Sequence, residues 1–473
     1  MAEPHRRIKL TAQWYTMARY KTIIVEIQKA FGGSLAAMDI LNVSGVGDLA
    51  SVYAVTDLAI ASIASAGMAV AEFIAIRSGK MPLIQVDRRL ASMWFSRSLR
   101  PIGWQLPQPW DAVAGDYKAS DNWIRLHTNA PHHRRAALQV LGCSEDREAV
   151  TKAVASWQAN ELEDAIVSAN GCAAVMRSAE DWSMHAQGRA VATEPLLHIS
   201  ATDSAHMPNW LIPAGRPLEG IRVLDLTRVL AGPVATRFLA SYGAQVLRID
   251  PIGWEEPGVV PEVVLGKRCA RLDLKSANGM ATLKKLLGDA DVIIHGYRTG
   301  ALAHLGLDSE ERQKLRPGLV DISLNAYGWN GPWKLRRGFD SLVQMSSGIA
   351  HTGMVKANKN CPFPLPVQAL DHATGYLLAA AAIRGLIRRV TSGQGMEVRA
   401  SLARTAAILA CYPVENGLAA KIEAENRNDL APAIEATAWG AAQRLKPPLV
   451  IEGCPMYWDL PSSPLGSSLA EWL

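Results

Sequence analysis

The chain has 473 residues, more than one hydrophobic core usually supports, so we expect at least two domains. Hydrophobic residues make up 49% and charged residues 20% of the chain, a composition that argues against disorder. The net charge of +5 is mild and no long Lys/Arg run is present, so we expect anionic ligands rather than a nucleic-acid partner.

Sequence features also bear on metals, secretion and membranes. The six cysteines are scattered without a CxxC pair, which predicts reduced thiols and no metal site. Residues 1–15 lack an apolar region before a small-residue cleavage site, so no signal peptide is expected. Residues 58–76 approach a membrane-spanning length but are rich in Ala and contain Glu72, which favours a buried helix. We therefore expect a cytoplasmic protein with no membrane partner.

The N-terminal half predicts short strands and helices joined by turn-rich segments. Apolar periodicity predicts helices, period-two alternation predicts strands, and Pro131 stands where a helix accepts proline in its first turn. A segment rich in Pro and Trp, 101–110, is expected to be a loop or linker. The expected helices are 55–77, 88–95, 131–141, 146–157 and 161–169, and the expected strands are 82–86 and 123–127.

Around 198–217 the periodicity is lost and Pro, Asp and Ser accumulate, which predicts a domain boundary. Beyond it, short apolar strands alternate with helices of about a dozen residues, a pattern typical of βαβ units and a parallel sheet. Ligands bind at the carboxyl ends of parallel strands, so the loops after these strands are the first candidates for a site. The expected strands are 221–226, 245–249, 291–294 and 320–324, and the expected helices are 231–242, 280–287 and 309–315.

Two segments of the chain resemble each other. In both, an Asp precedes an Ala-rich helix that ends in Ser-Gly and is followed by an apolar strand. Asp57 opens the first segment and Asp371 opens the second, and the interval from Asp to Ser-Gly is the same in both. This similarity predicts a degenerate internal duplication, although chance remains an alternative in such low-complexity sequence.

The segment from Thr227 to Pro233 joins a predicted strand to a predicted helix. A helix N-terminus built from small residues binds anions because its free N–H groups and the helix dipole both favour negative charge. The segment is not GxGxxG, so a nicotinamide dinucleotide is not indicated. Any βα loop can contain Gly and Pro, so this motif alone leaves an anion site and a plain connection equally open.

A series of ordered motifs extends over nearly 180 residues. They begin with PLEGIRVLDLT (217–227), AGP (231–233) and GAQVLRID (243–250), and continue through GKR (266–268), LDLK (272–275), ADV (290–292), GAL (300–302), YG (327–328), GFD (338–340), Asp371 and GQG (393–395). In this order they resemble the core of class III (CaiB/BaiF-type, formyl-CoA transferase-like) CoA-transferases. The resemblance implies an α/β fold with a Rossmann-like parallel-sheet large domain, a smaller α+β domain and an intertwined ring homodimer.

The same resemblance implies a reaction and its residues. It implies transfer of CoA from an acyl-CoA to a small carboxylic acid through a covalent aspartyl intermediate, with coenzyme A as substrate and no permanently bound cofactor. Asp371 matches the nucleophile position, and as a carboxylate it needs no base at neutral pH. The alternative is that Asp371 only caps the following helix, which is the role we expect for Asp57.

The resemblance also implies residues that contact CoA. These candidates are Arg228, Ala231 and Gly232 at the helix N-terminus, Lys267 near phosphate, Tyr297 on the adenine and Tyr327 at the thioester end. Surface solvation of the lysine and core packing of the tyrosines are the alternatives. Arg228, Leu230 and Asn325 depart from the formyl-CoA transferase pattern, which puts the formyl/oxalyl substrate pair in doubt.

Two other functions remain open. An acyl-CoA racemase or isomerase shares the fold but places a His where this chain has Phe339, unless His351 or His372 lies nearby. A non-catalytic acyl-CoA-binding homologue is the second alternative.

We expect residues 1–205 to be a degenerate partial copy that includes the small domain, residues 216–405 to be the large domain, and residues 406–473 to be a C-terminal tail.

Overall fold

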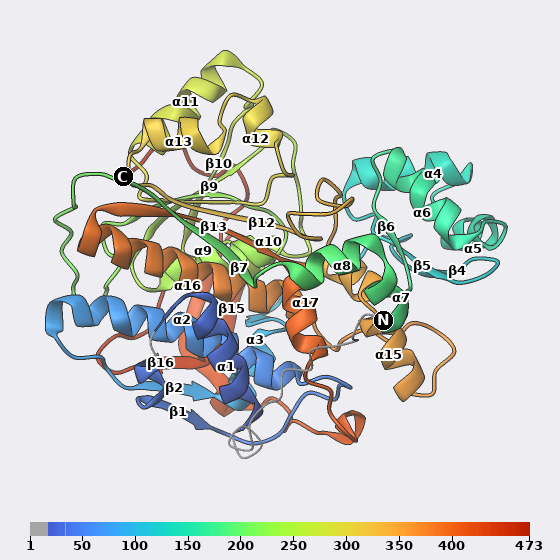
Figure 1. Cartoon of the computed structure of the whole chain (residues 1–473), viewed down its shortest axis with the longest axis horizontal. Helices are drawn as coiled ribbons and strands as arrows, with labels where there is room; N and C mark the ends of the chain where they lie inside the picture. Colours follow the sequence, from blue (N-terminus) through green and yellow to red (C-terminus); the bar gives the residue numbers. More distant parts are fainter. Residues whose placement is uncertain (1–17, 34) are drawn as a thin grey trace, which may run out of the picture.

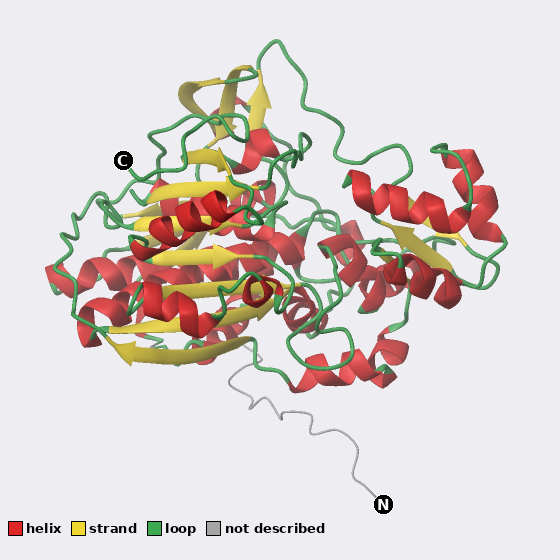
Figure 2. Cartoon of the chain, turned by 90° about the horizontal axis from the view of Figure 1, so that it is seen from above, coloured by secondary structure: helices red, strands yellow, loops and turns green. Residues whose placement is uncertain are grey.

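The computed structural model describes residues 18–33 and 35–473, and its centre is a seven-stranded sheet. Figure 2 shows this sheet between layers of helices. All neighbouring strands pair in parallel except β7, which is antiparallel to β13 at one edge. From edge to edge the strands are β10 (Lys267–Arg271), β9 (Gln245–Asp250), β8 (Arg222–Leu226), β11 (Val292–His295), β12 (Val320–Asn325), β13 (Gln394–Ser401) and β7 (Leu197–Ser204).

The strand order creates a crevice at the centre of this sheet. From β8 the chain proceeds outward through β9 to β10, and then returns to the other side of β8 as β11, β12 and β13. The order therefore reverses between β8 and β11, and the loops after these two strands diverge. A ligand crevice is expected where they part, at the carboxyl edge of the sheet.

Helices cover both faces because successive strand residues point in opposite directions. On β8, Val223 belongs to the core under α9 and α16, whereas Leu224 and Leu226 belong to the core under α11 and α13. The helices of this region are α9 (Ala231–Ser241), α10 (Val260–Val263), α11 (Ala277–Gly288), α12 (Ala301–His304), α13 (Ser309–Leu315), α14 (Asp340–Ser346), α15 (Ile349–Lys356), α16 (Ala369–Ser392) and α17 (Leu402–Ala410).

The N-terminal segment repeats part of this arrangement. The chain runs α2 (Val55–Ser78), β2 (Ile84–Asp87) and α3 (Arg88–Trp94), as it later runs α16, β13 and α17. Strand β1 (Leu41–Ser44) pairs in parallel with β2 as β12 does with β13, and β16 (Leu449–Ile451) is antiparallel to β2 as β7 is to β13. This correspondence supports the predicted internal duplication.

Helices α2 and α16 lie side by side (Figure 1). Both are rich in alanine, and the small side chains of Ala379–Ala382 are fully buried. Helix α1 (Arg19–Ala30) packs on α2, and α9 packs on α16. Among the described helices, only α2 is long and apolar enough to cross a membrane, and 83% of its apolar window is buried within the chain.

A small α+β domain projects beside the large one (Figure 1). Its sheet is antiparallel, in the order β4 (Gly115–Lys118), β5 (Trp123–Leu126) and β6 (Ala173–Val175). Three helices with their own apolar core cover it, namely α4 (Pro131–Leu141), α5 (Arg147–Ala155) and α6 (Ala159–Ser168). Helices α7 (Ala179–Met184) and α8 (Ala186–Thr193) lead back to β7.

Two regions contain strands that the sequence did not predict. The start of the segment in which the sequence loses periodicity forms β7, whose edge position leaves it half exposed and so without an apolar run. The region expected to be a C-terminal tail instead returns to the N-terminal half. There β14 (Leu430–Thr437) and β15 (Gly440–Leu445) pair with β3 (Leu99–Pro101), and β16 pairs with β2.

Candidate active site

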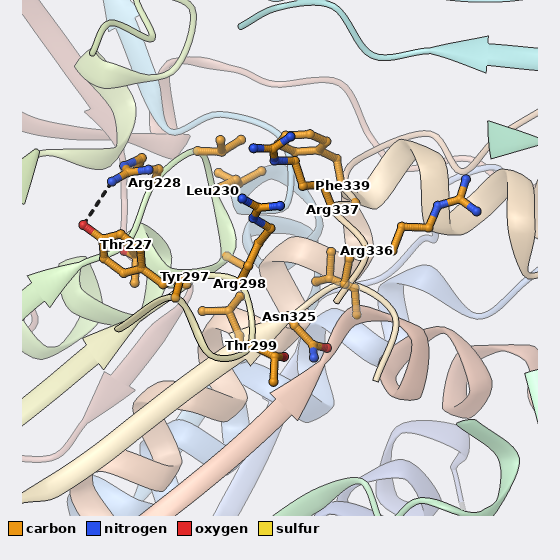
Figure 3. A pocket seen from close by; sticks show the side chains of 18 of the residues that line it. Thr227, Arg228, Leu230, Tyr297, Arg298, Thr299, Asn325, Arg336, Arg337 and Phe339 are labelled. Carbon is orange, nitrogen blue, oxygen red and sulfur yellow. Dashed lines mark hydrogen bonds between the residues drawn. The ribbon is translucent and has the colours of Figure 1, made fainter. Parts of the chain in front are cut away.

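Two cavities meet at Asp371, on the carboxyl side of the large sheet. The first, of about 360 Å³, lies at the crevice between β8 and β11 and is called the basic cavity for its arginines (Figure 3). The second, of about 450 Å³, lies on the other side of Leu230 and Phe339 and is called the aromatic cavity, for Phe95, Trp110 and Phe339 in its wall. Asp371 lines both.

The basic cavity gathers cations that lack carboxylate partners. Arg228 follows β8, Arg298 follows β11, and Lys334 and Arg337 come from the loop before α14. Within residues 18–33 and 35–473, none of these four side chains forms an ion pair. Burial and the neighbouring Arg298 lower the pKa of Arg337. Like charges held together without a counter-ion predict that an anionic ligand completes the site.

Arg228 lies between two aromatic rings at one wall of this cavity. Its guanidinium is 4.9 Å from the Trp254 ring centroid and 5.1 Å from that of Tyr297, and it donates a 3.2 Å hydrogen bond to the Tyr297 hydroxyl (Figure 3). These contacts orient Arg228 without neutralising it. The flat rings beside a cation also offer a surface on which a purine can stack.

The opposite wall is tied to the small domain. Glu163 of α6 is buried and pairs with Arg177 at 2.6 Å and with Arg336 at 3.0 Å. Arg336 also donates to the Ala173 carbonyl, and Arg337 donates to the Asn170 carbonyl. The loop that carries Arg337 is therefore fixed between the small and large domains.

Asp371 lies in the first turn of α16 and its backbone is held by a second carboxylate. Asp340 Oδ2 accepts the N–H of Leu370 at 2.8 Å and of Asp371 at 3.0 Å, while Oδ1 accepts from Gln344. Asp340 thus satisfies the helix N-terminus, and the helix-capping alternative for Asp371 is wrong. Within the described chain, the Asp371 carboxylate accepts no hydrogen bond and faces the cavities.

The two carboxyl groups titrate as a pair. Burial, and then the charge of Asp340, raise the pKa of Asp371 well above its usual range. Burial also raises the pKa of Asp340 to about 6, although its hydrogen bonds to the α16 N-terminus oppose this shift. Near neutral pH the two carboxyl groups therefore resist holding two negative charges at once.

Close packing brings the N-terminus of α9 to Asp371. A Cβ on Gly375, one turn after Asp371, would lie 2.5 Å from the Ala231 carbonyl oxygen, so only glycine permits this approach. Val229 in the preceding loop has φ +65°, an uncommon conformation for a β-branched residue. The carboxylate of Glu256 accepts a 2.9 Å hydrogen bond from the Val229 N–H.

The predicted site residues separate into two groups. Asp371, Arg228, Ala231 and Tyr297 line the basic cavity. Lys267, Tyr327 and Gly232 do not line either cavity.

Lys267 is 1% exposed and lies beneath α9, where its Nζ is 3.0 Å from Asp225 Oδ2 and 3.0 Å from the Pro233 carbonyl oxygen. Tyr327 is buried, with its hydroxyl 3.2 Å from Ser346 Oγ. A Cβ on Gly232 would lie 2.3 Å from the Thr227 Cβ, so this glycine allows the loop to fold over α9. The contacts assigned to these three residues by resemblance are therefore not part of the cavity walls.

Asp57 differs from Asp371 although the two helices correspond. Its carboxylate is 3.1 Å from Arg19 Nη1 and 3.1 Å from Arg88 Nη1. The N-cap position of α2 is Ala54, so the expected capping role of Asp57 is wrong. Arg19 and Arg88 neutralise Asp57, whereas Asp371 lies beside the carboxyl group of Asp340.

Sequence reasoning did not single out Arg298, Arg337 or Trp254. Arg298 directly follows Tyr297 after β11, and Arg337 precedes the GFD motif, so basic residues beside these motifs were the available signal. Trp254 had no such signal, because its loop after β9 is irregular. His127, which lines the aromatic cavity, was not recognised as a site residue either.

The comparisons with known proteins identify the region that carries this geometry. Residues 218–438 match the model of CoA-transferase family III. This segment belongs to CoA-transferase family III. A succinyl-CoA:glutarate CoA-transferase of Mus musculus is 34% identical over 201 residues, covering 40% of this chain and 45% of that protein.

Other relatives cover similar shares of this chain. A probable fatty acyl-CoA transferase of Mycobacterium tuberculosis is 33% identical over 192 residues, covering 38% of this chain and 48% of its own length. A solved CaiB/BaiF family protein from Brucella suis is 25% identical over 48% of this chain and 65% of its own, with a TM-score of 0.36. The chain spans about half the length of the curated relatives it matches.

The resemblance drawn from the ordered motifs is thereby confirmed for the family III segment. The mixed α/β fold with a parallel sheet is also confirmed. The intertwined homodimer, the division into domains and the cytoplasmic location remain predictions.

Proposed function

We propose that this chain is an acyl-CoA:carboxylate CoA-transferase and that Asp371 is its nucleophile. The observation that carries the proposal is the position of Asp371. Its carboxylate has no hydrogen-bond donor within the described chain and lies where a cavity of unpaired cations meets a cavity with aromatic walls. A thioester placed across this junction would present its carbonyl carbon to Asp371.

The first half of the proposed reaction uses the donor. The Asp371 carboxylate attacks the thioester carbonyl, the C–S bond breaks, and CoA leaves as a thiolate with a mixed anhydride left on Asp371. The thiolate then attacks the aspartyl carbonyl carbon. The donor acid departs as a carboxylate, and an aspartyl-CoA thioester remains.

The second half reverses these steps with the acceptor. The acceptor carboxylate attacks the aspartyl thioester, which releases CoA thiolate and forms a new mixed anhydride. The thiolate attacks the acceptor's carbonyl carbon, forming the new acyl-CoA and regenerating the Asp371 carboxylate. No proton, metal or redox partner is consumed.

The basic cavity is the proposed site for the nucleotide part of CoA. Arg298 and Arg337 are the proposed phosphate partners because they lack carboxylates of their own. Trp254 and Tyr297, which flank Arg228, are the proposed stacking surface for the adenine. Ala231 places the N-terminus of α9 beside the same cavity, where its dipole favours an anion.

One observation favours a second candidate, an acyl-CoA racemase or isomerase. Phe339 cannot exchange a proton, but the His127 ring stacks on it with a centroid separation of 3.7 Å and lines the aromatic cavity with Asp371. Burial lowers the pKa of His127 well below its usual value, so it would be present as a neutral base. His372 also lines this cavity.

The test incubates an acyl-CoA donor panel with carboxylic acids and measures new acyl-CoA by liquid chromatography and mass spectrometry. Formation of the acceptor's thioester by the wild type, lost in Asp371→Asn, supports the transferase. Loss of α-deuterium from a labelled acyl-CoA without any exchange of CoA supports the racemase. Calorimetric CoA binding without either reaction supports a non-catalytic binding protein.

We also propose that residues 1–205 are a degenerate first copy. The matching order of α2, β2 and α3 with α16, β13 and α17 supports this history. The consequence is that one chain contributes one reactive aspartate, because Arg19 and Arg88 neutralise Asp57. We therefore expect one covalent adduct per chain after reaction with an acyl-CoA.

A further inference from the structure

Part of the wall of the aromatic cavity lies outside the family III segment. Phe95 and Trp110 come from the N-terminal half, and Val259, Val263 and Val367 complete the apolar surface. Phe95 stacks on His372 with a centroid separation of 5.2 Å, and Trp110 meets His127 edge-on at 5.6 Å. These contacts hold the rings in fixed orientations around an apolar space.

Most carboxylates along this cavity are already engaged by the protein. Glu262 accepts hydrogen bonds from Ser98 and pairs with Arg237 and Arg444, and these two arginines overcome its burial to lower its pKa to about 2. Glu256 pairs with Arg248 and holds the Val229 N–H. Glu262 and Glu256 therefore do not provide free charge for a ligand.

The histidines of this cavity add no positive charge near neutral pH. Burial lowers the pKa of His372 to about 3, with Arg237 as a smaller cause. Burial, and then Arg125, lower the pKa of His127 well below its usual value. Both rings are thus uncharged surfaces, and the Asp371–Asp340 pair is the charged group at the inner end of the space.

We infer that the aromatic cavity holds the body of a bulky apolar carboxylic acid, so that the substrates are acids of aromatic size rather than short dicarboxylic acids. A volume of about 450 Å³ falls within the roughly 300–1,000 Å³ typical of sites for much larger molecules than a four- or five-carbon acid. A short dicarboxylic acid would leave most of this apolar wall uncovered. The inference rests on the proposed function, because Asp371 must receive the acid's carboxyl group.

Arg97 is the feature that opposes this inference. It lines the aromatic cavity, is half-buried, has no ion pair within the described chain and donates only a 3.4 Å hydrogen bond to the Gly258 carbonyl. It would be the partner of a second carboxylate if the substrate carried one. The test therefore compares an apolar acid with a dicarboxylic acid and includes Arg97.

The experiment measures binding of 3-phenylpropanoate and glutarate by calorimetry, which does not depend on turnover. Val259 is partly buried against the cavity wall, so Val259→Phe fills the space and Val259→Ala enlarges it. Val450→Phe is the control, because Val450 is 55% exposed on β16. Melting temperatures confirm that each variant folds.

We expect 3-phenylpropanoate to bind at least about tenfold more tightly than glutarate, since apolar contact governs such discrimination. Val259→Phe should weaken its binding about tenfold, whereas Val259→Ala and Val450→Phe should change it by less than about threefold. Tighter binding of glutarate, lost in Arg97→Gln, overturns the inference. Binding that Val259→Phe leaves unchanged also overturns it. If the proposed transferase function is wrong, the apolar acid still binds but no CoA exchange is observed. This outcome is distinct from failure of the inference about the cavity.

Discussion

The carboxylate of Asp340 accepts the backbone N–H of Asp371 at 3.0 Å, so one aspartate caps the helix whose first turn carries the other. This arrangement leaves the Asp371 side chain free of a capping role. It also places two buried carboxyl groups together without a cation between them, which raises the pKa of both by burial and, for Asp371, by the charge of Asp340. The pair therefore links reactivity, pH dependence and stability.

The charge of Asp340 should control the pH at which Asp371 reacts. Asp340→Asn removes that charge but keeps an oxygen that can accept the α16 N–H groups. The pKa of Asp371 should fall, so the midpoint of adduct formation should shift to lower pH by about one unit, equivalent to roughly 1.4 kcal/mol. Initial rates of adduct formation across pH provide the measurement. An unchanged midpoint would show that Asp340 does not act on Asp371 through its charge.

Asp371→Asn should stabilise the fold at high pH. The raised pKa means that folded Asp371 keeps a proton that the unfolded chain releases as the pH rises above the ordinary value of 3.8. The contribution of Asp371 to stability is therefore most favourable below that value and is lost as the pH rises towards the folded pKa, by about 1.4 kcal/mol per unit of raised pKa. The gain from Asp371→Asn should be present at pH 8 and shrink towards pH 4.

Urea denaturation at each pH measures this difference. The matched control is Asp289→Asn, because Asp289 is exposed after α11. An Asp371→Asn variant that is less stable than the wild type at pH 8 would contradict the account. Equal changes in the two variants would attribute the effect to net charge alone.

Arg298 and Arg337 should contribute to CoA affinity through charge. Replacing either with Gln should weaken CoA binding about tenfold or more, because charge-assisted hydrogen bonds contribute roughly 1.5–3 kcal/mol. This loss of CoA affinity should be smaller at high salt, because screening already weakens CoA binding by the wild type. Calorimetry at two salt concentrations tests this, with Lys314→Gln on the surface of α13 as control. Equal effects of all three substitutions would exclude a specific phosphate site.

Gly375 should be essential for the geometry of the site. Its ideal Cβ would lie 2.5 Å from the Ala231 carbonyl oxygen and 2.8 Å from the Val234 Cβ, so Gly375→Ala must separate α9 from α16. We expect a loss of about 1–3 kcal/mol in the free energy of unfolding and slower adduct formation. Gly288→Ala is the control, because its nearest neighbour is an ordinary 3.8 Å away. Comparable losses of unfolding free energy in Gly375→Ala and Gly288→Ala would contradict the close packing of α9 against α16.

Strongly apolar strands were predictable from the sequence, whereas half-exposed ones were not. Strands β8, β9, β11 and β12 are buried on both faces and read as apolar runs flanked by helical periodicity. The edge strand β7 carries polar residues on exposed positions, and the edge strand β10 carries them on buried and partly exposed positions, which hides the periodicity of both strands. The pairing of β16 with β2 joins segments more than 350 residues apart, and local sequence carries no signal for that contact.

The residues of the site also divide into those that the sequence predicted and those that it did not. Position along a βα unit placed Arg228, Ala231 and Tyr297 correctly at the carboxyl edge of the sheet. The family resemblance placed Lys267 near a phosphate of CoA, yet this lysine is buried beneath α9 and pairs with Asp225. The Asp340–Asp371 relationship depends on how α14 meets α16, which is a tertiary contact.

The most direct test of the central claim is intact-protein mass spectrometry after incubation with a panel of acyl-CoA thioesters. The wild type should gain the mass of one acyl or CoA group, and the site should map to Asp371 after proteolysis. Asp371→Asn should fold and gain no mass, while Asp57→Asn should be labelled as the wild type is, because Arg19 and Arg88 neutralise Asp57. An unlabelled wild type with measurable CoA binding, or label retained by Asp371→Asn, would contradict the assignment of Asp371 as nucleophile.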